Sequence, residues 1–188
     1  MNCSSTAEPA PPLRPRRRTA GPDPAHAHAM ACFPDCPLCI TDRDTLLWQD
    51  DKLRIIRVDE PRHPGYLRVI WQRHIAEMTD IDPMDRRHLM RTVFQVERLQ
   101  RICLRPDKIN LASLGNQVPH LHWHLIPRWR DDPCFPDAIW APPRHNPARA
   151  AAWADRCDAL APHVARLHRV LAARGPTADI SGDDTRDA

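Results

Sequence analysis

The sequence predicts an α+β fold, in which a long helix packs against an antiparallel sheet of about five strands and a C-terminal helix is added. Two observations favour this class. Short apolar segments bounded by turn residues recur between residues 45 and 127, as expected for strands. Amphipathic helical patterns follow Pro83 and Asn146. Helices packed on one sheet would bury the apolar sides of both kinds of element.

Length and composition indicate a single-domain protein of the cytoplasm. The 188 residues suffice for one sizeable core. The sequence contains no apolar run of membrane-spanning length and no signal-peptide core. A net charge of +3 is too small to indicate specific nucleic acid binding. The seven cysteines are scattered and odd in number, which favours a reducing compartment over a disulfide framework.

The expected organisation is a central domain between two disordered ends. Residues 1–31 are rich in Pro, Ala and Arg and are expected to be disordered. The central domain should cover residues 32–145, and an amphipathic helix should cover residues 146–175. Gly175-Pro176 should end this helix, and residues 176–188 are expected to be disordered.

Turn residues separate the expected strands from one another and from the helix between them. The expected strands are residues 45–48, 52–58, 66–71, 108–114 and 118–127. The helix should begin with Asp82 as its N-cap and Pro83 in its first turn, and Pro106 should end it. Its apolar stripe suits either the domain core or the surface of a homodimer.

The last expected strand carries three histidines at a spacing of two. His120, His122 and His124 alternate with apolar residues, so a strand would put the three imidazoles on one face. Pro119 and Pro127 bracket the segment, as prolines do at strand ends. Such a face can hold a metal, or one imidazole can act as a nucleophile that its neighbours orient. Histidines that only face solvent are the third interpretation.

A cysteine pair should begin the ordered chain, at Cys36-Pro37-Leu38-Cys39. In a reducing compartment this spacing favours zinc over a disulfide, with redox chemistry as the alternative. A closed zinc site needs four ligands, so two more must come from elsewhere in the fold. A cysteine pair that binds no metal is the remaining interpretation.

The stretch from His120 to Ile126 resembles the active-site strand of the histidine triad (HIT) superfamily, whose pattern is His-φ-His-φ-His-φ-φ with φ apolar. All seven positions fit. Residues 64–74 are similar to the Pro-Gly-His-x-x-Val-Ile-Pro-x-x-His stretch of the family, with Tyr66 in place of the first His and Trp71 in place of the second Pro. The resemblance extends over residues 36–130 and looks closest to the bacterial branch similar to diadenosine tetraphosphate hydrolases.

The resemblance implies an enzyme, a nucleotide hydrolase or transferase that cleaves at the α-phosphate of a dinucleoside polyphosphate or a nucleoside phosphoramidate. His122 would attack the α-phosphorus and form a nucleotidyl-histidine, which water then hydrolyses. His124 would bind the phosphate and handle the proton of the leaving group. The expected partner is therefore a nucleotide substrate. Binding to a membrane or to a specific nucleic acid is not expected.

The resemblance also completes the expected zinc site. In the zinc-containing branches of the family, two histidines complete a similar cysteine pair, and the matching positions here are His74 and His120. A structural Zn²⁺ on Cys36, Cys39, His74 and His120 is therefore expected. In this role the metal would not activate water.

Five further residues are expected to bind the substrate. Asp59 stands where the family often places an acidic residue that binds ribose, and a turn carboxylate is the alternative. Asn110 and Asn116 offer neutral donors and acceptors, and Gly115 lets the backbone approach a phosphate. Gln117 completes this loop, which lacks the Ser or Thr hydroxyl that many family members carry next.

Two other classes of function are compatible with these residues. One is a zinc-water hydrolase in which the histidine cluster binds a single metal. The outer two histidines would lie roughly 13 Å apart on a strand that rises about 3.3 Å per residue, which disfavours this geometry. The other class is a non-catalytic nucleotide-binding protein, and the intact triad weighs against it.

Overall fold

The computed structural model describes residues 33, 35–40, 45–144 and 146–180. Its elements in chain order are β1 (Leu46–Gln49), β2 (Leu53–Arg57), β3 (Leu67–Trp71), the 3-10 helix η1 (Met78–Asp80), α1 (Pro83–Leu104), β4 (Lys108–Ala112), β5 (His122–Arg128) and α2 (Pro147–Arg174). The strands form one antiparallel sheet in the order β1-β2-β3-β5-β4. The predicted α+β class is confirmed.

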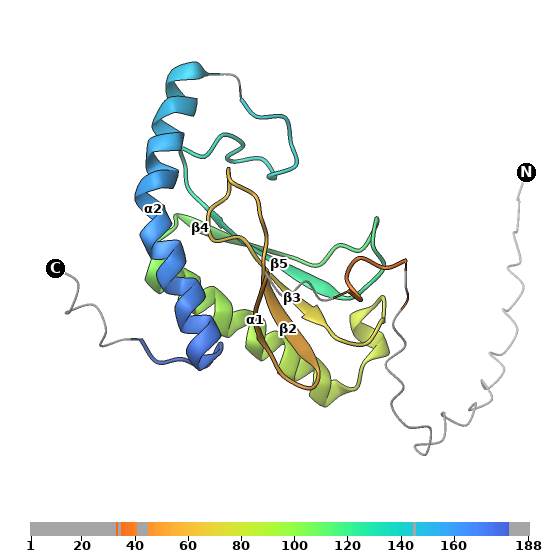
Figure 1. The fold of residues 1–188 in the computed structure, drawn as a ribbon. Helices are drawn as coiled ribbons and strands as arrows, with labels where there is room; N and C mark the ends of the chain where they lie inside the picture. The colour runs from red at the N-terminus through yellow and green to blue at the C-terminus, as the bar shows by residue number, and fades with distance from the viewer. Residues whose placement is uncertain (1–32, 34, 41–44, 145, 181–188) are drawn as a thin grey trace, which may run out of the picture.

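The two long helices lie on one side of the molecule, as Figure 1 shows. Helix α1 packs against β3 and β5, and α2 packs against α1 and the edge strand β1. Leu121 and Leu125 point from the β5 segment into this core. Because side chains alternate along a strand, His122 and His124 point to the opposite face, which neither long helix covers.

The ends of α1 agree with the sequence prediction. The carboxylate of Asp82 accepts a hydrogen bond from the backbone N–H of Met84 at 2.7 Å, and Pro83 occupies the first turn. The helix ends one residue beyond Cys103, and Arg105 then adopts a left-handed conformation (φ 47°) that turns the chain toward β4. Capping of this kind fixes where the helix starts and how the chain leaves it.

The strand that carries the histidines differs from its prediction at both ends. It begins at His122, so His120 lies in the bend before the strand instead of on the same face as the other two. Pro127 lies inside β5 and not at its end. This is tolerated because β3 begins at Leu67, opposite Leu125, so β5 has only β4 as its neighbour at Pro127.

Helix α2 is anchored on the domain. The Asn146 side chain caps it by accepting from the N–H of Arg149 at 3.0 Å. Its buried residues belong to the predicted amphipathic seam, and they are Trp153, Leu160, Leu167 and Leu171. Within the expected C-terminal tail the structure describes residues 176–180, where Ala178 and Ile180 are buried in the core.

The remaining tail predictions fall on residues 1–31 and 181–188, which lie outside the described residues. Within the described part of the chain, neither long helix is apolar enough along its length to cross a membrane.

Candidate functional site

A cavity of about 440 Å³ opens on the sheet face that carries His122 and His124. Its lining comes from the cysteine segment (residues 35–40), strands β2, β3 and β5, the loop between β4 and β5, and the segment before α2. The lining residues include Leu38, Ile40, Arg54, Arg68, Leu114, Gly115, Asn116, Gln117, His122, His124 and Trp140. These residues are far apart in the sequence, and the sheet brings them together.

Strand register explains how the floor of the cavity is assembled. His124 lies directly opposite Arg68 on β3, and His122 lies opposite Ile70. Ile70 in turn lies opposite Arg54 on β2. Residues directly opposite in neighbouring strands project to the same face, so two arginines and two histidines line one surface.

The hydrogen bonds of His122 leave one ring nitrogen available for chemistry. Its Nδ1 lies 2.6 Å from the backbone oxygen of His120, and a carbonyl oxygen only accepts, so Nδ1 carries the hydrogen. In a neutral ring Nε2 then holds the lone pair, and it lies 3.0 Å from Nε2 of His124. The Nδ1 atom of His124 contacts the Tyr66 hydroxyl.

Burial keeps the two imidazoles neutral. Burial lowers the pKa of His122, although its hydrogen bond to the His120 carbonyl acts in the opposite direction. Burial also lowers the pKa of His124 to about 3, and the neighbouring His122 and Arg68 add to the effect. Both rings are therefore uncharged near neutral pH, as a nucleophilic imidazole must be.

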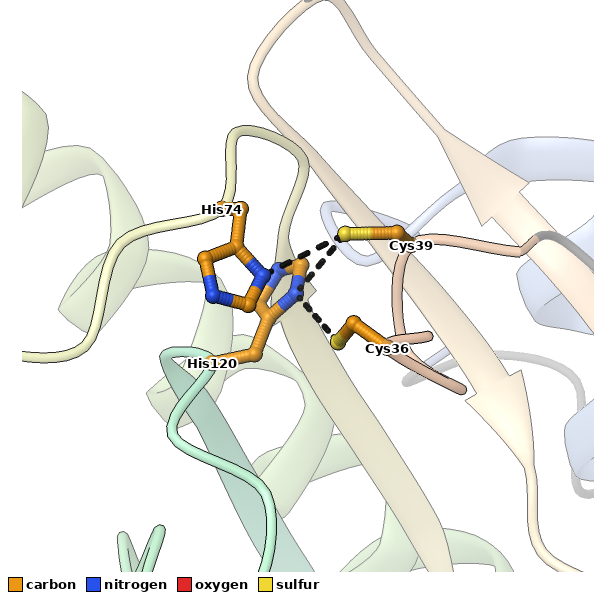
Figure 2. A group of neighbouring side chains, drawn as sticks. All are labelled: Cys36, Cys39, His74 and His120. Atoms are coloured by element: carbon orange, nitrogen blue, oxygen red, sulfur yellow. Dashed lines mark hydrogen bonds between the residues drawn. The ribbon is translucent and has the colours of Figure 1, made fainter. Parts of the chain in front are cut away.

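A second cluster lies beside the cavity and contains the four residues predicted to hold zinc. Figure 2 shows Cys36, Cys39, His74 and His120 directed toward one another. One ligand atom from each lies within 4.8 Å of all the others. Within the described residues, this is the one group of three or more His, Cys, Asp or Glu side chains whose ligand atoms lie close enough together to hold a metal ion.

The distances in this cluster suit a tetrahedral metal. The Sγ atom of Cys36 lies 3.5 Å from Nδ1 of His120, and Sγ of Cys39 lies 3.3 Å from Nδ1 of His74 and 3.6 Å from Nδ1 of His120. With Zn–S and Zn–N bonds of about 2.3 and 2.0 Å, the edges of a zinc tetrahedron measure about 3.3–3.8 Å. The donor set of two sulfurs and two nitrogens therefore fits Zn²⁺.

The hydrogen bond made by Nε2 of His120 sets the tautomer in which Nδ1 can bind a metal. Its Nε2 lies 2.6 Å from the backbone oxygen of Trp71, so Nε2 carries the hydrogen and the lone pair of Nδ1 faces the cysteines. Trp71 ends β3, and His74 follows in the next loop. Because β3 and β5 are neighbours, both histidines reach the cysteine segment.

The predicted substrate-binding residues do not all reach the cavity. Gly115, Asn116 and Gln117 line it. Asn110 lines a neighbouring cavity, and its Oδ1 accepts a hydrogen bond from Arg128 at 2.8 Å. Asp59 is exposed and lines neither cavity. Asn110 and Asp59 are therefore not among the lining residues of the cavity that contains His122.

Sequence reasoning missed four residues of the site. Arg54 and Arg68 line the cavity, the Trp140 ring lies 5.7 Å from that of His124, and Tyr66 contacts the same histidine. Arg54 and Arg68 alternate with apolar residues along their strands. A correct prediction of how the strands pair would therefore have placed both arginines on the same face as the histidines. The sequence offers no comparable signal for Trp140.

Comparisons with known proteins identify relatives of this chain. Residues 41–131 match the HIT domain family. The chain is 30% identical over 81 residues to an AP-4-A phosphorylase of Mycobacterium tuberculosis, an alignment that covers 40% of this chain and 42% of the relative. It is 27% identical over 97 residues to a bis(5'-nucleosyl)-tetraphosphatase (asymmetrical) of Schizosaccharomyces pombe, covering 49% and 53%. The chain thus spans about half the length of the curated relatives it matches.

Solved structures are also similar. A histidine triad protein from Bradyrhizobium japonicum has a TM-score of 0.49 and 25% identity, covering 64% of this chain and 92% of that protein. A Zn-bound histidine triad family protein from Mycobacterium smegmatis has a TM-score of 0.43 and 22% identity, covering 65% and 85%.

Proposed function

Because the chain belongs to the histidine triad (HIT) superfamily, we propose that it is a nucleotide hydrolase or transferase that works through a nucleotidyl-histidine on His122. One observation carries the proposal. The hydrogen bond from Nδ1 of His122 to the His120 carbonyl leaves the Nε2 lone pair at the cavity. That nitrogen is the atom that would attack the α-phosphorus.

The reaction would then run in two steps. Nε2 of His122 forms a bond to phosphorus, and the bond from phosphorus to the leaving group breaks. The Nε2–H of His124, 3.0 Å from the nucleophile, lies where it can donate to an oxygen or nitrogen of the reacting phosphate. Water next attacks the same phosphorus, the phosphorus–nitrogen bond breaks, and the nucleoside monophosphate leaves. If inorganic phosphate attacked this phosphorus in place of water, the enzyme would be a phosphorylase.

The cavity suits a nucleotide. Three apolar side chains on its wall, Ile40, Leu114 and Trp140, are each more than half exposed, and exposed apolar residues that gather in a cavity are typical of ligand-binding sites. An aromatic ring offers a base a surface for stacking. Arg68 and Arg54 supply positive charge on the cavity floor, where phosphates would lie.

The names of the two curated relatives support dinucleoside tetraphosphates as the first substrates to test. Nucleoside phosphoramidates form the second class, because the same nucleophile would displace an amine. The two classes differ in the leaving group and share the α-phosphate chemistry.

Zinc, in this proposal, is structural. Cys36, Cys39, His74 and His120 would hold it, and the bound ion would contribute folding energy by joining the cysteine segment to β3 and β5. The zinc-water alternative receives no support from this arrangement. His120 faces the cysteines, whereas His122 and His124 face each other, so the three rings do not converge on one point.

A cytoplasmic homodimer completes the proposal. The structure contains no disulfide among the described cysteines, and the odd number of scattered cysteines in the sequence favours a reducing compartment. Phe94 on α1 is 55% exposed and offers an apolar contact for a second copy.

The test is a substrate panel with a matched pair of variants. Wild-type protein is incubated with dinucleoside polyphosphates and nucleoside phosphoramidates, and products are separated by chromatography. His122→Asn should abolish turnover while AMP binding persists, and His163→Asn, at an exposed position on α2, should remain active. Near-normal activity of His122→Asn would contradict the covalent mechanism. AMP binding by wild type without turnover of any compound would support the binding-protein alternative.

A further inference from the structure

Tyr66 stands at the end of a chain of hydrogen bonds that begins at the backbone carbonyl of His120. The carbonyl accepts from Nδ1 of His122, and Nε2 of His122 lies 3.0 Å from Nε2 of His124. The proposed nucleophile must present a lone pair on its Nε2, so Nε2 of His124 carries a hydrogen. Nδ1 of a neutral His124 is then an acceptor, and the Tyr66 hydroxyl is its donor.

The hydrogen bond from the Tyr66 hydroxyl to Nδ1 of His124 determines how His124 can protonate the leaving group. A neutral imidazole that gave away its only hydrogen would become an imidazolate anion, which is too basic to form near neutral pH. His124 can therefore transfer its Nε2 hydrogen only if Nδ1 gains another at the same time. Tyr66 is the donor in contact with that nitrogen.

Arg68 stands beside the same hydroxyl group. It lies directly opposite His124 in the β3–β5 ladder, and its Cζ lies 5.8 Å from the centre of the Tyr66 ring. Burial raises the pKa of Tyr66, but the charge of Arg68 and a hydrogen bond from it act in the opposite direction. The guanidinium would thus stabilise negative charge that develops on the phenol oxygen.

We propose that Tyr66 is a positioning residue that keeps a hydrogen on Nε2 of His124 and replaces it through Nδ1 when His124 protonates the leaving group. The inference rests on the proposed function of His122. In the first step the phosphorus–nitrogen bond to His122 forms and the bond to the leaving group breaks. The His124 Nε2 hydrogen moves to the leaving atom, and the Tyr66 hydrogen moves to Nδ1.

The second step restores the starting state. Water attacks phosphorus, and one of its hydrogens moves to Nε2 of His124. The Nδ1 hydrogen returns to the Tyr66 oxygen, and the phosphorus–nitrogen bond breaks. Atoms and charge balance over the two steps, with Arg68 beside the transient phenolate.

We call the coupled proton transfers from Tyr66 to His124 and from His124 to the leaving atom the relay. The relay matters most when the leaving group needs a proton. An amine displaced from a phosphoramidate must be protonated to leave, whereas p-nitrophenolate or a nucleoside polyphosphate departs as an anion. Loss of the Tyr66 hydroxyl should therefore slow the first class selectively. A residue that only filled space would slow both classes alike.

The experiment compares Tyr66→Phe with wild type on two AMP derivatives, an amine phosphoramidate and the p-nitrophenyl ester. The expected fall in kcat/KM, to which the shared hydrolysis step does not contribute, is about 100-fold or more for the amine, the usual range for acid catalysis, and about threefold or less for the ester. Tyr66→His, which retains a donor, should restore part of the rate on the amine. Equal losses on both compounds, or no loss on either, would overturn the proposal.

Two controls separate this inference from the proposed function. Tyr66 is the one tyrosine in the chain, so Tyr labelled at Cζ gives a single NMR signal that reports its hydrogen bond. That signal should shift in His124→Ala and stay in place in His163→Asn, and an unmoved signal in both would refute the contact. Loss of all activity in His122→Asn together with normal leaving-group dependence in Tyr66→Phe would reject the relay alone. Absence of turnover by wild type would reject both.

Discussion

The backbone oxygen of His120 lies 2.6 Å from Nδ1 of His122, while the His120 ring turns the other way, with its Nδ1 3.5 Å from Sγ of Cys36. One residue therefore belongs to two sites. Its carbonyl orients the proposed nucleophile, and its imidazole belongs to the proposed metal cluster. Any change that moves the His120 backbone should affect both.

Loss of the metal should therefore lower stability strongly and activity moderately. Cys36→Ser should bind less zinc and unfold at a lower temperature, because a closed tetrahedral site contributes folding energy. Each kcal/mol lost should lower Tm by about 2–4 °C for a chain of this size. Activity per folded molecule should fall less than in His122→Asn, since His122 keeps its own ring in place.

Metal content and thermal unfolding measure these effects. Cys157→Ser, on α2 and outside the cluster, is the matched control and should keep its metal. Wild-type protein prepared without chelators that contained no zinc would remove the metal from the proposal and leave the His122 chemistry intact.

The covalent intermediate should be trapped on His122. A phosphorus–nitrogen bond to imidazole survives base and breaks in acid, so a substrate labelled at the α-phosphorus and quenched in alkali should leave label on the protein. Peptide mapping should place the label between Leu121 and Trp123. A metal-activated water would attack phosphorus directly and leave no label. Label on another residue would rule out His122 as the nucleophile.

Trp140 should contribute to substrate affinity more than to the rate of the chemical step. Its side chain is 57% exposed on the wall of the cavity. Stacking of a base on an aromatic ring is worth about 1–3 kcal/mol, so Trp140→Ala should raise KM roughly 5- to 150-fold. Trp140→Phe should recover much of the affinity, and Met84→Ala, exposed on α1, should leave KM unchanged. An unaltered KM in Trp140→Ala would place the base elsewhere.

The folded protein should lose stability as the pH falls below about 6.5. Burial lowers the pKa of His124 to about 3 in the fold, with further contributions from His122 and Arg68, while an unfolded histidine titrates near its ordinary value. Between these pKa values the unfolded chain binds one more proton than the folded chain. Acidification therefore favours unfolding, by up to about 1.4 kcal/mol per pH unit for one histidine.

Urea unfolding measured between pH 7.5 and pH 5 should show this slope. His124→Gln should flatten it by about one proton. A variant that kept the full wild-type slope would show that His124 does not contribute to it.

The sequence by itself determined the elements and their local chemistry. Asp82 and Pro83 marked the start of α1, because a carboxylate cap and an N-terminal proline satisfy helix geometry locally. The alternation from Leu121 to Leu125 assigned one side of that segment to the core. These signals depend on neighbouring residues alone, and a chain met for the first time displays them.

Resemblance to the family supplied the more distant pairings. Nothing in the spacing of Cys36 and Cys39 pointed to His74, yet the structure brings these residues together. The proposed roles of His122 and His124 likewise came from the family pattern. The contact of Tyr66 with His124 was not predicted, although the sequence marked Tyr66 as a departure from that pattern.

Only the tertiary structure decided how the three histidines are divided. β5 begins at His122 because the segment before it bends, which turns His120 toward the cysteines. Arg68 lies beside His124 because the two residues are directly opposite in the paired strands β3 and β5, and Arg128 donates a hydrogen bond to Oδ1 of Asn110. Register and long-range contacts are set by how whole elements pack, so a local pattern shows which residues can meet a partner but not which partner they meet.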